Sequence, residues 1–190
     1  MKELGMQVGT REYGEGDGMG GPPMENETIV VKAIRKGDWG LCNSIMSTYA
    51  DESYQDEWRE KTEDGETPWQ VALTEIGRVE LARLVREGED VNEAPKTWGG
   101  NTVLHDACKR GRVDVVEYVV GEGGDVNGKG RQGFTPTVLA CRGGMVEVVR
   151  LCLEGGGDWK VVVAGKNGRE WAEGQGKRGE GVVELIDGWE

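Results

Sequence analysis

Residues 100–128 read GNTVLHDACKRGRVDVVEYVVGEGGDVNG, and residues 133–159 repeat much of this text as GFTPTVLACRGGMVEVVRLCLEGGGDW. An earlier copy, GETPWQVALTEIGRVELARLVREGEDVN, occupies residues 65–92 and fits with a one-residue adjustment between its two apolar stretches. A recurrence at a fixed period indicates a repeat architecture, in which each unit buries its apolar face against its neighbours.

Each copy opens on a threonine that can cap a helix. Thr67, Thr102 and Thr135 are spaced by 35 and 33 residues, and Pro68 and Pro136 occupy the first helical position, where a missing N–H costs nothing. A second stretch follows with valines and leucines on one side, as in an amphipathic helix. The helices are expected to end at glycines that reverse the chain, namely Gly77, Gly111 and Gly144 for the first helix and Gly88, Gly123 and Gly156 for the second.

This pattern resembles the ankyrin repeat, a helix pair followed by a projecting finger. The resemblance rests on Thr-x-Leu-His at residues 102–105, Thr-Pro at 67–68 and 135–136, and Asp-Val-Asn at 90–92 and 125–127. It implies an all-α fold, an ankyrin-repeat solenoid of stacked helix pairs with projecting hairpin fingers. It also implies that the motif histidine bonds the backbone and ties adjacent units together.

Weaker copies extend the array at both ends, where a stacked fold needs atypical caps. Gln70 and Val138 replace the motif histidine in the flanking copies. Residues 1–24 are rich in glycine and are predicted to be a disordered leader, followed by one ankyrin-repeat domain over residues 25–190. The predicted units lie near residues 25–64, 65–99, 100–132, 133–167 and 168–190.

The composition excludes several partners. The formal net charge is −12, which argues against nucleic acid or an anionic membrane as the main partner because both reward basic surfaces. No stretch approaches the roughly 18 apolar residues of a membrane span. The first residues show no apolar secretory segment, so we expect a reducing compartment, the cytoplasm, with the nucleus as the alternative.

His105, Asp106 and Cys108 raise the alternative of a Cys/His enzyme. The resemblance gives His105 a structural role instead, and this fold rarely supplies a catalytic pocket. Cys108 and Cys141 share one phase of the repeat and are expected to be free thiols. The cysteine spacing suggests no metal site, and the G-x-G-x-x-G strings lack a strand-to-helix context, so we expect no metal, cofactor or enzymatic activity.

The charge is concentrated at one end of the chain. Residues 1–95 carry 21 acidic and 10 basic side chains, against 14 and 13 in residues 96–190. The excess gathers between residues 51 and 66, an enlarged first finger that also carries aromatic residues; the alternative is a charged loop that is only solvated. The predicted partner-binding residues are Tyr54, Asp56, Glu57, Trp58, Glu60, Glu63, Asp64, Glu93 and Trp98.

The sequence therefore predicts a monomeric, non-enzymatic protein–protein interaction module. It would present this acidic, aromatic-bearing surface to a basic protein segment, in one version as a chaperone. The alternatives are a generic regulatory adaptor with a non-basic partner and the Cys/His enzyme.

Overall fold

The computed structural model describes residues 29–38, 40–41, 61–62, 65–76, 79, 82 and 90–189. Within these ranges the chain forms helices and turns, and its one β-pairing is an isolated bridge between Val163 and Lys166. The elements are α1 (Ile29–Lys36), α4 (Pro68–Val71), the π-helical η2 (Ala72–Ile76), the 3-10 turn η3 (Lys96–Trp98), α6 (Val103–Arg110), α7 (Val113–Gly121), the 3-10 turn η4 (Arg131–Gly133), α8 (Pro136–Gly143), α9 (Val146–Glu154), α10 (Gly168–Glu173) and α11 (Lys177–Asp187).

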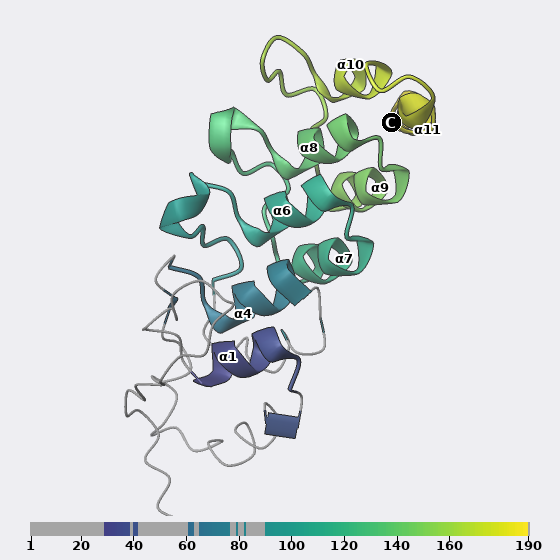
Figure 1. Ribbon diagram of the computed structural model, residues 1–190. Helices are drawn as coiled ribbons and strands as arrows, with labels where there is room; N and C mark the ends of the chain where they lie inside the picture. Colours follow the sequence, from purple (N-terminus) through teal and green to yellow (C-terminus); the bar gives the residue numbers. More distant parts are fainter. Residues whose placement is uncertain are drawn as a thin grey trace, which may run out of the picture.

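The helices stack in two rows, which confirms the predicted solenoid of helix pairs. Figure 1 shows α1, α4, α6, α8 and α10 following one another in a first row, with α7, α9 and α11 in a second row. The segments that carry η3 and η4 project from one side of the first row, which we call the finger side. Each finger turns through a short 3-10 segment.

The helix starts follow the predicted capping. The Thr67 hydroxyl accepts a hydrogen bond from the Gln70 amide at 3.3 Å, and Thr135 accepts one from the Val138 amide at 3.2 Å. Gly111 ends α6 with a φ of 73°, in the left-handed region that favours glycine. The second helices end two residues earlier than expected, at Gly121 and Glu154, because an ordinary turn precedes the left-handed glycines at 123 and 156.

The core lies between the two rows of helices. The apolar side of the second helices is buried as predicted, with additional contributions from Tyr118 and Cys152. Its buried valines are Val115, Val116, Val119, Val148 and Val149. Three other apolar residues of these helices, Val120, Val146 and Leu151, are only half-buried. Each unit thus buries a narrow apolar face against the next, which suits a chain poor in large apolar residues.

The one-residue adjustment of the 65–92 copy lies inside its first helix and not between its helices. Thr67 and Gly77 are ten residues apart, against nine between Thr102 and Gly111. The structure accommodates the additional residue by continuing α4 as the π-helical η2, whose wider turn holds one residue more. Arg112 from the next unit donates to the carbonyl oxygens of Leu73 and Thr74 in this segment, at 2.7 and 2.6 Å.

Candidate partner-binding surface

His105 fixes the finger that follows its own helix. Its Nδ1 accepts a hydrogen bond from the Thr102 amide at 3.1 Å, so its Nε2 carries the proton that faces the carbonyl oxygens of Gly128 at 3.1 Å and Phe134 at 3.2 Å. Burial lowers the pKa of His105 below its ordinary value, despite opposing hydrogen bonds to the two carbonyls. The predicted structural role of this histidine is confirmed.

Gln70 performs the same task one unit earlier. Its Oε1 accepts from the Thr67 amide at 2.9 Å, and its Nε2 donates to the Glu93 carbonyl oxygen at 3.0 Å. Sequence reasoning treated Gln70 as a departure from the motif. An amide side chain, however, supplies one acceptor and one donor with a reach similar to that of imidazole. This chemical similarity could have predicted the role of Gln70 from the sequence.

Asparagines tie one finger to the next. Asn92 donates through Nδ2 to the Gly123 carbonyl oxygen at 3.2 Å, and its Oδ1 accepts from the Asp125 amide at 2.8 Å. Asn127 repeats both bonds one unit further on, to Gly156 at 2.9 Å and from Asp158 at 2.7 Å. We call these bonds the asparagine ladder. It holds successive fingers at a fixed register, so that they present one continuous face.

The buried thiols do not form a nucleophilic site. Cys108, Cys141 and Cys152 are buried and free, and the sulfur atoms of Cys108 and Cys152 lie 3.6 Å apart. A hydrogen bond with Cys152, together with burial, raises the pKa of Cys108 well above its ordinary value. Burial raises the pKa of Cys141 to about 12. A reactive cysteine needs a lowered pKa and access to solvent. Cys108 and Cys141 have neither, and Cys152 is buried.

A groove of about 390 Å³ opens on the finger side, between the finger that carries η3 and the first helices of the neighbouring units. The indole of Trp98 is half-buried beside it. The Nε of Arg110 donates to Asp106 Oδ1 at 2.9 Å, whereas Asp106 Oδ2 is buried and has no hydrogen-bond partner in the part of the chain that the structure describes. We call this site the Trp98 groove, and it is lined by Glu66, Thr74, Thr97, Trp98, Asn101, Asp106, Arg110 and Arg131.

The structure places two of the predicted partner-binding residues. Trp98 lines the groove, and Glu93 is half-exposed and forms an ion pair with Lys61. The groove residues on α6 were missed, although the four-residue spacing of Asp106 and Arg110 puts both on one helix face. The remaining predicted residues lie outside the described residues: Tyr54, Asp56, Glu57, Trp58, Glu60, Glu63 and Asp64.

The described ranges hold no cluster of three or more His, Cys, Asp or Glu side chains placed to bind a metal ion. Among the same residues, no helix combines the length and apolar character needed to cross a membrane.

Comparison with known proteins identifies the repeats. Residues 81–163 match the family model described as ankyrin repeats in three copies. The chain carries ankyrin repeats. The ankyrin array is 37% identical to a 2-5A-dependent ribonuclease of Mus musculus over 62 residues, which are 33% of this chain and 8% of that protein.

Two further relatives align over longer stretches of the array. Alpha-latroinsectotoxin-Lt1a of Latrodectus tredecimguttatus is 29% identical over 117 residues, which are 62% of this chain and 8% of the toxin. A probable E3 ubiquitin-protein ligase, XBOS33, of Oryza sativa subsp. japonica is 37% identical over 84 residues, which are 44% of this chain and 16% of the ligase. The chain thus spans less than a fifth of the length of each of these relatives.

Proposed function

We propose that this ankyrin array is a non-enzymatic module that binds a basic segment of another protein on its finger side. Ankyrin repeats generally mediate protein–protein interaction. The observation that carries the proposal is the Trp98 groove, which is lined both by Trp98 and by Asp106, whose Oδ2 has no hydrogen-bond partner among the described residues. An arginine or lysine of the partner would donate to that oxygen and stack on the indole.

The acidic stretch supports a basic partner. Residues 51–66 contain eight acidic and two basic side chains, and the last of them, Glu66, lines the Trp98 groove. Long-range attraction by this stretch would speed encounter, while the buried contacts at Trp98 and Asp106 would retain the partner. The same proposal places a monomeric protein in the cytoplasm, with the nucleus as the alternative.

The test uses a fluorescein-labelled peptide of alternating lysine, arginine and glycine, with binding measured by fluorescence anisotropy. We expect Trp98→Ala and the triple variant Glu57→Lys, Glu60→Lys and Glu63→Lys each to weaken binding by about tenfold or more. Affinity should also fall steeply as the salt concentration rises.

A matched control changes the net charge by the same amount elsewhere. Glu154, Glu180 and Glu184 are exposed on α9 and α11, in the second row of helices, and are changed together to lysine. This variant should retain most of the affinity. Equal losses in the two triple variants would show that net charge alone attracts the peptide, and the assignment to the finger side would be wrong.

A regulatory adaptor with a non-basic partner is the second candidate, because the Trp98 groove also contains Arg110 and Arg131, which balance its two acids. A partner of mixed or neutral charge would bind with little dependence on salt. A natural partner whose affinity is unchanged between about 50 and 300 mM salt would favour this second function.

A further inference from the structure

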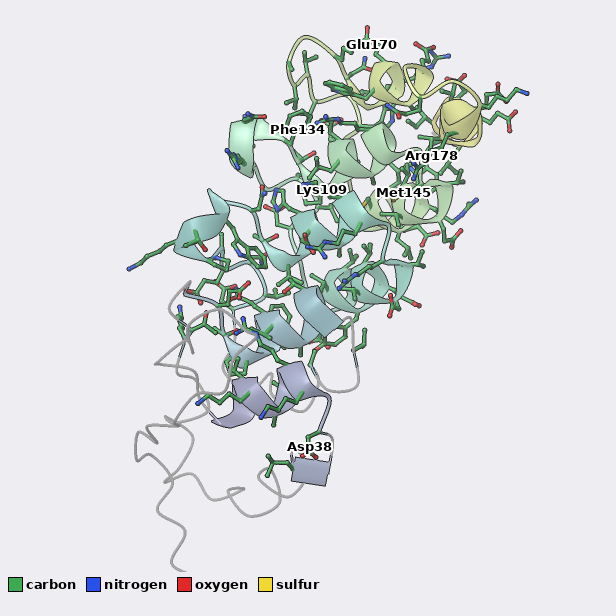
Figure 2. All side chains as sticks on the ribbon, in the orientation of Figure 1. Asp38, Lys109, Phe134, Met145, Glu170 and Arg178 are labelled. Carbon is green, nitrogen blue, oxygen red and sulfur yellow. The ribbon has the colours of Figure 1, made fainter. Side chains whose placement is uncertain are left out.

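A second cluster of charged and aromatic side chains lies near the other end of the array. Arg142, near the end of α8, is exposed, and its Cζ lies 5.2 Å from the centre of the Phe134 ring and 5.0 Å from that of Trp171. The ammonium of Lys166 lies 5.2 Å from the same Trp171 ring. We call these four residues the Arg142 site. Figure 2 shows Phe134 on the finger side of the array.

The site is rigid. Phe134 is 7% exposed, and its ring centre lies 5.8 Å from that of Trp171. The Trp171 indole donates from Nε1 to the Val163 carbonyl oxygen at 3.2 Å. Contact with the two rings therefore restricts the guanidinium of Arg142, and among the described residues its N–H groups form no hydrogen bond.

Neither cation of the Arg142 site is neutralised within the part of the chain that the structure describes. The ion pairs of that part involve other side chains. The acids on the neighbouring α10 are engaged, since Glu170 accepts a hydrogen bond from the Asn167 amide and Glu173 pairs with Arg169. Two cations on one indole ring, at most about 10 Å apart, repel each other, and an added anion would relieve the repulsion.

We propose that the Arg142 site binds an aspartate or glutamate side chain of an acidic protein segment. A carboxylate accepts two parallel hydrogen bonds from a guanidinium, and contact with two rings already restricts Arg142, so less entropy is lost on binding. The site uses other residues than the Trp98 groove and does not rest on the proposed function. The array thus offers an acidic stretch at one end and a cationic site at the other.

The repeat itself supplies a control. Lys109 occupies the place of Arg142 one unit earlier in the array, 33 residues before it, and is also exposed, but the aromatic rings of the described residues make no cation–π contact with it. Lys109→Ala removes an exposed cation without changing a ring contact. Arg142→Lys keeps the charge of the site and removes the planar donor group.

The experiment measures binding of fluorescein-labelled hexaglutamate by anisotropy, with the full chain. Arg142→Ala should weaken binding about tenfold and Arg142→Lys by about threefold, while Lys109→Ala stays within about twofold of the parent. A nuclear magnetic resonance titration of the unmodified protein should move the Arg142 Nε–H and Trp171 indole signals together, which keeps the test valid if a variant unfolds.

Three results would overturn the proposal. The first is an equal loss of affinity in Arg142→Ala and Lys109→Ala. The second is a titration in which the Arg142 and Trp171 signals do not move. The third is tighter binding of a labelled single-stranded RNA hexamer than of hexaglutamate, which would assign the site to another class of partner.

Discussion

His105 and Gln70 show how one residue position can join two units of the array. Each side chain accepts a hydrogen bond from the threonine amide at its helix start and faces a backbone carbonyl of the finger that follows. Both residues are almost fully buried. Loss of either side chain would leave buried backbone groups without partners, which is costly in free energy.

Replacing His105 by alanine should lower the free energy of unfolding by about 2–4 kcal/mol, because a buried donor and acceptor lose their partners and a cavity forms. His105→Gln should cost about half as much, because glutamine already performs this role at position 70. Urea unfolding followed by circular dichroism measures both. The same loss for alanine and glutamine would mean that only the ring volume of His105 matters.

The single histidine also makes a pH prediction possible. Burial lowers the pKa of His105 in the folded protein, so the unfolded chain binds a proton at a higher pH than the folded one. The contribution of His105 is complete above the unfolded pKa of about 6.5, and stability is lost as the pH falls below it, by at most about 1.4 kcal/mol per pH unit. Urea midpoints at about pH 7.5, 6.5 and 5.5 should show this decline in the parent and not in His105→Gln.

At the scale of helices, Arg112 stabilises the π-helical segment of the preceding unit. Met145 occupies the position that corresponds to Arg112 one unit later, 33 residues on. The first helix of that later unit has no additional residue. Arg112→Met should therefore cost about 2 kcal/mol, since two carbonyl groups lose a charged donor. Hydrogen exchange of the backbone amides of residues 68–76 measures this loss of stability. Unchanged protection there would show that η2 does not depend on Arg112.

The pairing of α10 with α11 depends on a glycine. A Cβ atom at Gly179 would lie 1.8 Å from the Ala172 carbonyl oxygen, so Gly179→Ala must push the two helices apart and should lower the melting temperature by several degrees. Gly121, at the end of α7, is the control: a Cβ there meets nothing within 4 Å. Gly121→Ala should be neutral or stabilising by up to about 1 kcal/mol, since alanine favours helix.

At the scale of the whole molecule, we expect the asparagine ladder to couple the unfolding of neighbouring units. Asn127→Ala removes both bonds between neighbouring fingers and should cost about 1–3 kcal/mol. In a linear array, weakening one joint lets the units on either side unfold separately. Hydrogen exchange should therefore show peptides of α6 and α9 opening at different urea concentrations.

Asn127→Asp keeps the acceptor for the Asp158 amide and removes the donor to Gly156, so its loss of stability should be intermediate. A single transition in both variants, with α6 and α9 opening together as in the parent, would show that the ladder does not couple the units.

The sequence predicted those features of the array that depend on local rules. Threonine caps, glycine turns and the valine side of the second helices recur with the period, and a period is visible in one sequence. The contacts of Arg112 with the preceding unit and the unpartnered oxygen of Asp106 were not predictable, because the packing of successive units creates them. Within the predicted site, only Trp98 and Glu93 belong to the described residues, and Trp98 alone lines the groove.

The asparagine ladder also determines where an additional repeat can be inserted into the array. Position 160, which corresponds to Asn92 and Asn127, is a lysine whose amide closes the same turn onto Asp158 but whose side chain offers no amide for a following finger. A duplicate of residues 100–132 grafted after residue 132 would therefore find matching asparagines on both sides. The same module grafted beyond Lys160 would lack that anchor and would rely on helix packing alone.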